Sequence, residues 1–417
     1  MNALTPDAPG VSSPMPRLRL HFLDGMRGLA ALYVVIYHVY GWLIFRDTNA
    51  LAHLPPILRT FVGGIQYGRY SVDVFICLSG YCLMLPVVRA ANNRLDGGLK
   101  GFFKRRARRI LPTYYGALAL SVALAEWHAH KHGTHFVSNH VGDIVSHLFL
   151  VHNIKFAWYN SINYPMWSIA TEWQIYFLFP LLLLPVWRRF GNWAAIAAGF
   201  LVGFAPHLLL PAQNNFDWAA PWYVGLFAMG MAAAALTMSD RFTRYRLTSR
   251  AALIGFGLAL IPARYALVWA AARGNWHAVG LQDSWMGCIA ICLILYCARA
   301  AREKSEKRPA LVRFLEAPAT LTLGMFSYSL YLVHSLVIMD CGTVLDKLKV
   351  PLVPALVLML MAAVPLAVGV AYLFYLVFER PFTSPARRVE RKPTPVREPH
   401  EEITAPDRLP APSGEAV

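Results

Sequence analysis

Long apolar runs recur along almost the whole chain, separated by short polar segments. Each run has about 17 to 25 residues, which is enough for a helix to cross roughly 30 Å of hydrocarbon. Of the 417 residues, 57% are hydrophobic and only 15% are charged, and the mean hydropathy is +0.42. These values are typical of polytopic membrane proteins rather than soluble globular ones. The sequence therefore predicts an all-α integral membrane protein with about ten transmembrane helices, at about 27–45, 72–90, 110–127, 167–187, 192–211, 218–237, 251–271, 283–299, 318–340 and 353–378.

Basic residues form short clusters between the apolar runs and give the chain a formal net charge of +16. Ten spans place both termini on one side of the membrane, and 30 of the 39 Lys and Arg residues fall on that side. Cytoplasmic loops carry the excess of Lys and Arg in membrane proteins, so both termini are predicted to be cytoplasmic. Because the clusters are dispersed, they indicate contact with membrane lipid and not with nucleic acid.

The two ends of the chain differ in composition from the region between them. Residues 1–20 and 383–417 lack apolar periodicity and are rich in Pro and charged or small residues, which predicts disordered cytoplasmic tails. Residues 21–382 are predicted to form one transmembrane domain. No cleavable signal precedes the first apolar run, so that run is expected to be retained as a span.

The cysteines show no metal-binding pattern, and a histidine-rich tract, which can bind metal, has no Cys ligand beside it. The six cysteines lie within or at the end of apolar runs without zinc-type spacing, which indicates small buried hydrophobic residues. The predicted outer segment 128–166 holds seven of the fourteen histidines. We interpret it as a solvated loop, and no metal site is predicted.

The first span carries an arginine and a histidine within an otherwise apolar run. The eleven steps from Arg27 to His38 turn a helix by about three full turns plus roughly 20°, so both side chains leave the same face, about 16 Å apart along the axis. Ionisable residues at such depth indicate a functional site. In the alternative interpretation, Arg27 forms only a surface ion pair with Asp24, and His38 is a satisfied interior hydrogen-bonding group.

Two further spans carry polar side chains on one helical face. Arg106 and Arg109 lie one turn apart at the cytoplasmic entry to the third span, where two guanidiniums suit a polyanion such as a nucleotide phosphate. Contact with anionic lipid is the alternative. In the fourth span, Ser168, Glu172 and Tyr176 recur at every fourth residue, which places a carboxylate inside the membrane region.

The last two predicted spans carry one ionisable candidate each. His334 lies among hydroxyl side chains in the ninth span, where either proton handling or packing explains it. Glu379 follows the tenth span and precedes Arg380 and Pro381, which end the helix. We expect Glu379 to have a structural role at the helix end.

Six short motifs follow one another along the chain. They are Leu23-Asp-Gly-Met-Arg27-Gly-Leu-Ala-Ala with His38, Ser71-Val-Asp73-Val-Phe-Ile-Cys-Leu-Ser79-Gly80, Arg106-x-x-Arg109, Trp167-Ser-x-x-x-Glu172, Ser327-Tyr-Ser-Leu-Tyr-Leu-x-His334 and Glu379-Arg-Pro-Phe. Taken together, these motifs resemble the membrane-bound acyltransferase-3 family of bacterial O-acyltransferases over about residues 20–382. The sequence departs from the family pattern at Trp173, often a second acid, and at Val333, often Trp.

The resemblance implies a multi-pass enzyme of the bacterial inner membrane. It would move an acyl group, usually acetyl, from cytoplasmic acyl-coenzyme A to a hydroxyl of a carbohydrate or lipid-linked glycan. Acyl-coenzyme A is then a donor substrate, and no permanently bound cofactor is expected. The identity of the acceptor, the length of the acyl group and the oligomeric state stay open.

In that reaction, the basic residues would bind the acyl-coenzyme A donor, and the histidine would take part in the transfer itself. Arg106 and Arg109 would hold the phosphates, with Arg27 at the mouth of the passage. His38 would act as general base or as an acyl relay, and Glu172 or Asp73 would orient its imidazole. The alternative is a proton-coupled transporter using the same groups, although no internal repeat of the kind common in transporters is evident. A catalytically idle membrane scaffold or sensor is a third possibility.

Overall fold

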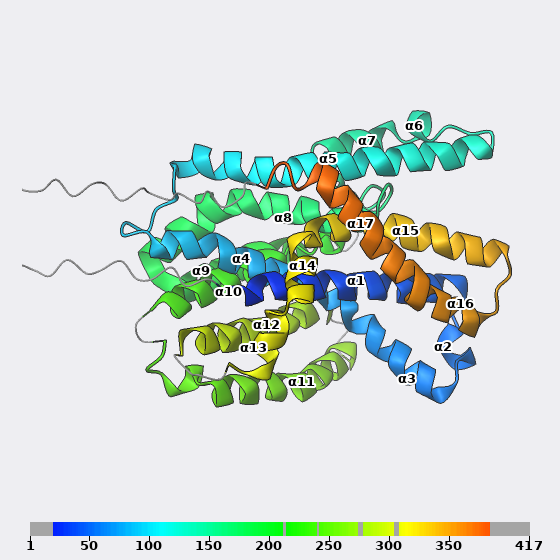
Figure 1. Cartoon of the computed structure of the whole chain (residues 1–417). Coiled ribbons are helices and arrows are strands. Elements are labelled where there is room, and N and C mark those ends of the chain that lie inside the picture. Colours follow the sequence, from blue (N-terminus) through cyan, green and yellow to red (C-terminus); the bar gives the residue numbers. More distant parts are fainter. Residues whose placement is uncertain (1–19, 212–213, 240–241, 274–277, 304–307, 384–417) are drawn as a thin grey trace, which may run out of the picture. The chain divides into compact units, whose positions relative to one another are not determined.

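The computed structural model describes residues 20–211, 214–239, 242–273, 278–303 and 308–383. The chain divides into residues 1–383 and 384–417. The two predicted tails lie almost wholly outside the described residues. Within those ranges every regular element is a helix (Figure 1).

The longer helices correspond in position to the apolar runs of the sequence. They are α1 (Phe22–Arg46), α4 (Ser71–Arg89), α5 (Gly98–Lys131), α8 (Met166–Leu178), α9 (Leu184–Leu209), α10 (Tyr223–Met238), α11 (Arg250–Arg273), α12 (Ala278–Arg302), α15 (Ser327–Lys347), α16 (Leu352–Leu358) and α17 (Val364–Phe378). Shorter helices are α2 (Ala50–His53), α3 (Pro56–Ile65), α6 (Phe136–Asn139), α7 (Val141–Leu148), α13 (Ala310–Leu315) and α14 (Pro318–Met325).

Seven helical stretches of the described chain are long and apolar enough to cross a membrane, as expected of a multi-pass membrane protein. The count of ten spans and the cytoplasmic termini stay predictions. The seven stretches are Phe22–Arg46, Pro56–Arg89, Met166–Leu209, Asp217–Met238, Val279–Arg302, Ser327–Lys347 and Leu352–Phe378.

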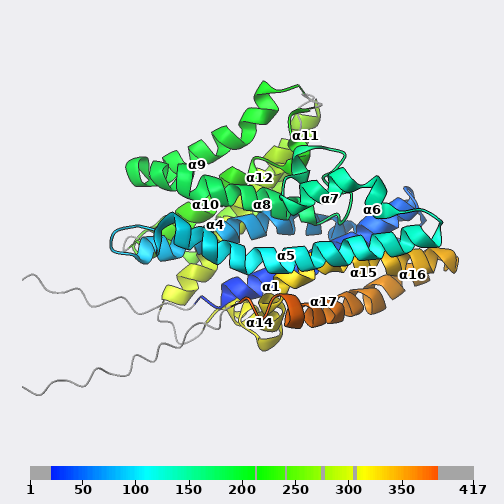
Figure 2. The same ribbon diagram turned by 90° about the horizontal axis from the view of Figure 1, so that it is seen from above.

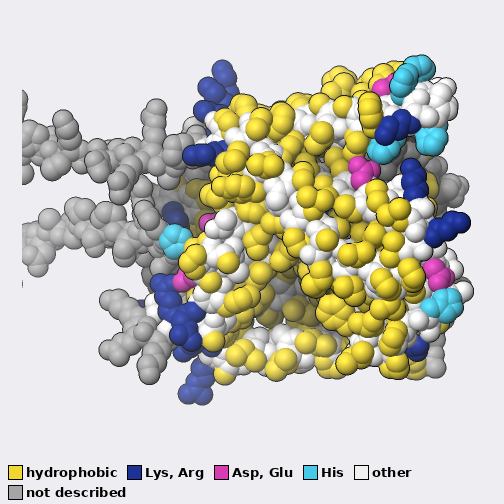
Figure 3. All heavy atoms as spheres, turned by 45° about the vertical axis from the view of Figure 1, so that its right-hand side comes forward, with side chains coloured by type: hydrophobic (Ala, Val, Ile, Leu, Met, Phe, Trp, Pro, Cys, Tyr) yellow, Lys and Arg dark blue, Asp and Glu magenta, His cyan; other side chains and the backbone are white. Residues whose placement is uncertain are grey.

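Apolar side chains dominate one face of the molecule (Figure 3). Figure 3 shows a face covered by a broad area of hydrophobic side chains, with charged side chains gathered toward two opposite edges. The exposed residues in the described chain include many large apolar ones, such as Phe45, Leu201 and Met361. A lipid-facing surface requires this distribution, because no water is present to solvate polar groups in the hydrocarbon.

Two predictions from the sequence were wrong, one about a predicted span and one about a predicted loop. The ninth predicted span, 318–340, is divided between α14 and α15, because Phe326 leaves the helical conformation with φ −115° and ψ 20°. The segment 128–166 is not simply a solvated loop. It contains α6 and α7, and its His147 and His152 are fully buried, with their rings stacked at 3.7 Å.

Close backbone contacts hold the helices that carry the site. α4 packs on α10, and α1 packs on α14, α15 and α4. A Cβ at Gly28 of α1 would lie 2.5 Å from the Gly324 nitrogen of α14, and a Cβ at Gly230 of α10 would lie 2.1 Å from the Cys77 oxygen of α4. Small residues allow such contacts in membrane helix bundles, where packing replaces much of the hydrophobic driving force.

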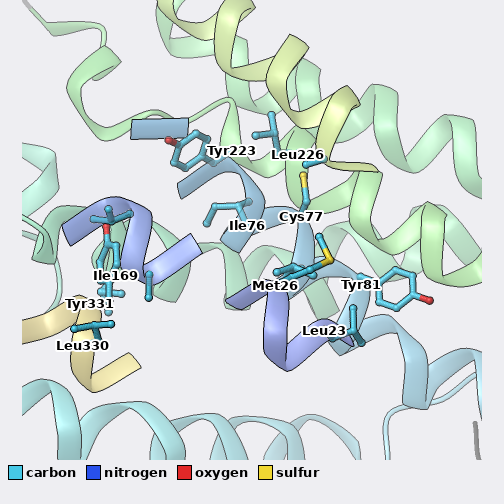
Figure 4. Close-up of a cluster of buried hydrophobic side chains, with 14 of the residues drawn as sticks. Leu23, Met26, Ile76, Cys77, Tyr81, Ile169, Tyr223, Leu226, Leu330 and Tyr331 are labelled. Carbon is cyan, nitrogen blue, oxygen red and sulfur yellow. The ribbon is translucent and has the colours of Figure 1, made fainter. Parts of the chain in front are cut away.

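The buried side chains of these helices form one continuous core. Figure 4 draws part of it, with Leu23 and Met26 from α1, Ile76 and Cys77 from α4, and Leu226 from α10. On another side, α5 packs against α15 and α17 (Figure 2). The positions of α1, α4, α5, α8 and α15 relative to one another are therefore set by packing before any polar contact is considered.

Candidate functional site

An inner cavity lies among α1, α4, α5, α8 and α15, and encloses about 800 Å³ including its open mouth. It joins three guanidiniums, one carboxylate and several hydroxyls that are far apart in the sequence. Its polar lining residues are Arg27, Arg106, Arg109, Glu172, Ser79, Ser168, Tyr176, Ser327, Tyr328 and Tyr331. The predicted groups on α1, α5 and α8 thus line a common space.

Arg27 forms the ion pair with Asp24 that the sequence suggested, and it also lines the inner cavity. Its Nη1 lies 3.3 Å from Asp24 Oδ1, with the Arg27 side chain 19% and the Asp24 side chain 53% exposed. The surface ion pair is therefore present. Arg27 and Arg109 also line a second cavity that adjoins His21 and Asp24, so these two guanidiniums stand between that cavity and the inner one.

Arg106 and Arg109 lie one turn apart on α5, and both line the inner cavity. In the described part of the chain, neither lies within ion-pair distance of a carboxylate, and Glu379 is the carboxylate that interacts electrostatically with Arg109. The two guanidiniums and Arg27 therefore create a locally positive wall. Forked donors in that arrangement are suited to phosphate groups.

Glu172 is held by the next turn of its own helix. The Tyr176 hydroxyl donates to Glu172 Oε1 at 2.5 Å, and Ser79 Oγ of α4 lies 3.1 Å from the same hydroxyl. Ser168, Glu172 and Tyr176 all line the inner cavity. Glu172 is therefore in the space with the arginines, and it is not a hydrogen-bond partner of His38.

An outer cavity encloses about 890 Å³, again including its mouth, and it contains His38. Eight aromatic side chains and three charged ones line it. The aromatic residues are Tyr37, Tyr159, Tyr164, Trp167, Trp218, Trp222, Tyr223 and Tyr331, and the charged residues are Arg69, Asp217 and Asp283.

His38 and His334 form a hydrogen-bonded pair of imidazoles. His38 Nδ1 lies 2.9 Å from the Val34 carbonyl and 3.1 Å from His334 Nε2, while His334 Nδ1 lies 2.9 Å from the Leu330 carbonyl. Because a carbonyl can only accept, the hydrogen bonds assign the proton of each neutral ring to Nδ1. His334 Nε2 then accepts from His38 Nδ1.

This tautomer leaves a lone pair on His38 Nε2. That atom has no hydrogen bond to any described residue. Tyr164 packs edge-to-face on the His38 ring, with ring centroids 5.7 Å apart, and also lines the outer cavity. The imidazole is thus held on its Nδ1 side, while its basic nitrogen is buried and has no partner among the described residues.

The loop before α8 is fixed by Asn163, which is buried beside α15. Its Nδ2 donates to Ser121 Oγ at 3.0 Å and to the Leu332 carbonyl at 2.9 Å, and its Oδ1 accepts from Ser335 Oγ at 2.6 Å. These contacts hold the adjacent Tyr164 next to the histidine pair.

The remaining candidates have other surroundings. Glu379 Oε2 accepts from the Ser329 nitrogen at 3.0 Å and from Ser329 Oγ at 2.5 Å, which ties the end of α17 to the first turn of α15. Burial raises the pKa of the Glu379 carboxyl, and the Ser329 hydrogen bonds oppose that shift. Asp73 is buried on α4 and lines neither large cavity, and its charged neighbours are Asp283 and Arg69.

Sequence reasoning missed most of the outer cavity. Its walls come from segments separated by more than two hundred residues, which no local periodicity connects. One signal was available: the run Asp217-Trp-Ala-Ala-Pro-Trp222-Tyr223 is unusually aromatic for the start of a span. Among the described residues, no group of three or more His, Cys, Asp or Glu side chains is placed to hold a metal ion.

The sequence is similar to those of several bacterial proteins. The chain is 30% identical over 172 residues to YrhL of Bacillus subtilis, a match covering 39% of this chain and 23% of that protein. It is 27% identical over 173 residues to the peptidoglycan O-acetyltransferase OatA of Listeria monocytogenes, covering 39% and 24% of the two chains. It is 22% identical over 366 residues to the O-acetyltransferase OatA of Staphylococcus aureus, covering 82% and 54%.

The chain thus matches between about a quarter and about half of the length of these relatives. No solved structure matches it. The model of the acyltransferase domain matches residues 20–376, which is most of the chain. The resemblance seen in the motifs is therefore confirmed, and the chain belongs to the acyltransferase-3 family.

Proposed function

We propose that this protein is an O-acetyltransferase that moves an acetyl group from acetyl-coenzyme A to a sugar hydroxyl of a cell-envelope glycan. It would act in the bacterial inner membrane. The observation that carries the proposal is the free Nε2 of His38 in the outer cavity, fixed through Nδ1 by His334 and separated from a three-arginine inner cavity by a shared wall.

The inner cavity suits the donor. Coenzyme A carries phosphates that match the guanidiniums of Arg106 and Arg109, with Arg27 beside Arg109 at the entrance. Its pantetheine arm is narrow and carries amides, and the hydroxyls of Ser79, Ser168 and Tyr328 offer hydrogen bonds along the way. In this assignment, the donor enters from the cytoplasm past Arg27 and Arg109.

The outer cavity suits a carbohydrate acceptor. Flat aromatic faces pack against the C–H faces of sugar rings, while Asp217, Asp283 and Arg69 supply hydrogen bonds at defined positions. The names of the relatives in Listeria and Staphylococcus indicate O-acetylation, in the first case of peptidoglycan. We therefore take a glycan of that kind as the first acceptor to test.

His38 would act as a general base. Its Nε2 removes the proton from the acceptor hydroxyl, and the hydroxyl oxygen attacks the thioester carbonyl carbon. The new C–O bond forms, the C–S bond breaks, and coenzyme A leaves as a thiolate that receives the proton from His38. Direct transfer is favoured over an acyl-histidine because His38 lines the acceptor cavity and not the donor cavity.

Purified protein in lipid nanodiscs tests this proposal. It is incubated with acetyl-coenzyme A carrying an isotopically labelled acetyl group and with muropeptides prepared from unacetylated peptidoglycan. We expect a labelled ester on the sugar, with one free coenzyme A released per ester formed. Proton-coupled uptake by vesicles containing the protein, without any labelled ester on a range of glycans, would instead support the transporter.

A further inference from the structure

The inner and outer cavities share two lining residues, Tyr331 and Val72. If the proposed function holds, the thioester enters from the inner side and the acceptor hydroxyl lies on the outer side. The bond between them must then form at this shared wall. The side chains of the wall are consequently the ones nearest to the reacting carbonyl.

The reaction places negative charge on the carbonyl oxygen when the hydroxyl attacks. Enzymes of acyl transfer stabilise that oxygen with a fixed hydrogen-bond donor. Val72 has no polar side-chain atom, and His38 Nε2 is occupied as the base. The Tyr331 hydroxyl is thus the donor that the shared wall offers.

A second hydroxyl fixes the position of the first. Tyr331 Oη lies 2.6 Å from Ser168 Oγ, and Ser168 Oγ lies 3.1 Å from the Pro165 carbonyl. Tyr331 is 5% and Ser168 3% exposed. With Ser168 donating to Pro165, Tyr331 donates to Ser168. When Ser168 donates to Tyr331 instead, the Tyr331 proton is released toward a substrate oxygen.

Switching between these two states needs only rotation about two C–O bonds, and no heavy atom has to move. The ring itself is held by neighbouring aromatic side chains. Its centroid lies 5.7 Å from that of Phe75 in an edge-to-face contact and 6.0 Å from that of His334. The His334 ring in turn lies 4.7 Å from the His38 ring. Tyr331, with its hydroxyl as hydrogen-bond donor, and His38, the proposed base, therefore lie in one cluster of packed rings.

We propose that the Tyr331 hydroxyl is the oxyanion donor of the transfer reaction, and that Ser168 positions it. The ring also serves as the wall that separates the two cavities. This assignment rests on the proposed function and adds a catalytic residue to it.

Tyr331→Phe tests the assignment because it keeps the ring and removes the hydroxyl. We expect kcat to fall by about 10²- to 10³-fold, as for loss of one oxyanion donor, while KM for acetyl-coenzyme A stays within about threefold. Tyr81→Phe is the matched control: Tyr81 is fully buried on α4 and lines neither cavity, so its kcat should stay close to the wild-type value. A Tyr331→Phe protein with kcat within about threefold of wild type overturns the assignment.

A second variant covers the case in which Tyr331→Phe fails to fold. Ser168→Ala keeps the Tyr331 side chain and removes the hydroxyl that positions it. We expect kcat to fall by about tenfold, as for loss of one hydrogen bond, and Ser168→Thr, which keeps a hydroxyl, to recover most of that loss. A Ser168→Ala protein with the wild-type kcat would overturn the assignment. If the wild type itself transfers nothing, the proposed function fails and the assignment fails with it.

Discussion

His334 Nε2 lies 3.1 Å from His38 Nδ1, although the two residues are 296 positions apart in the chain. The pair continues to the Leu330 carbonyl through His334 Nδ1, so the orientation of the first imidazole depends on the backbone of α15. Under the proposed function, His334 would position the His38 ring by accepting from Nδ1 together with the Val34 carbonyl.

His334→Ala should therefore lower kcat by about tenfold, since the His38 ring loses one of the two hydrogen bonds that hold it in place, while the Val34 carbonyl still accepts from Nδ1. His334→Gln can still accept a hydrogen bond through its side-chain oxygen, and we expect it to recover part of the activity. Rates of acetyl transfer and the pH profile of kcat/KM check this. Equal activity in the alanine and glutamine variants, with an unchanged pH profile, would assign His334 to packing alone.

The double substitution Arg106→Ala with Arg109→Ala should weaken donor binding. Each charge-assisted hydrogen bond contributes about 1.5–3 kcal/mol, so the Kd for coenzyme A should rise by at least tenfold in calorimetry. Lys104→Ala with Arg108→Ala is the control, because these basic residues share α5 but do not line the inner cavity. Equal affinities in the two double variants would point to a lipid-contacting role for Arg106 and Arg109.

The stacked histidines outside the candidate spans should make the fold sensitive to acid. Burial lowers the pKa of His147 to about 4 and that of His152 to about 3. An unfolded histidine titrates near 6.5, so the unfolded chain takes up protons first as the pH falls. The free energy of unfolding is therefore highest above about pH 6.5. Below that pH it falls by about 1.4 kcal/mol per pH unit for each histidine, until the pH reaches the pKa of the folded state.

Thermal unfolding between pH 7 and pH 4.5 measures this effect. His152→Phe, which retains a stacked ring, should show a flatter dependence on pH than the wild type. His132→Gln, at an exposed position, should follow the wild-type curve. A His152→Phe protein that loses stability with acid as steeply as the wild type would assign the sensitivity to other groups.

Gly28→Ala should destabilise the protein, because its Cβ would lie 2.5 Å from the Gly324 nitrogen. Overpacking of this kind typically costs about 1–3 kcal/mol. Gly41→Ala on the same helix meets no atom within 4 Å, and it should be neutral or slightly stabilising. Unfolding midpoints of the two variants give the comparison, and a Gly28→Ala protein as stable as Gly41→Ala would show that α1 and α14 separate easily.

Sequence patterns correctly predicted which side chains lie together where those side chains belong to one helix. Periodicity placed Ser168, Glu172 and Tyr176 on one face of α8, and all three line the inner cavity. The spacing of Arg106 and Arg109 likewise predicted a shared helical face, and both side chains line the inner cavity. In both cases the helical repeat alone determines the arrangement.

Periodicity could not predict contacts between helices. Nothing in the sequence around His38 indicates that its partner is His334 rather than Glu172 or Asp73, because that choice depends on how α1 packs on α15. The break at Phe326 was hidden for a similar reason. The apolar run continues through it, and the close contact between Gly28 and Gly324 appears only when α14 lies against α1.

The most direct test of the central claim is acetyl transfer by His38→Gln, measured beside donor binding in the same preparation. We predict that labelled ester formation on the glycan falls by at least about 10²-fold, while the Kd for acetyl-coenzyme A stays within about threefold of wild type. His132→Gln should transfer normally. A His38→Gln protein that binds the donor and still acetylates the glycan at the wild-type rate would contradict the assignment of His38 as the base.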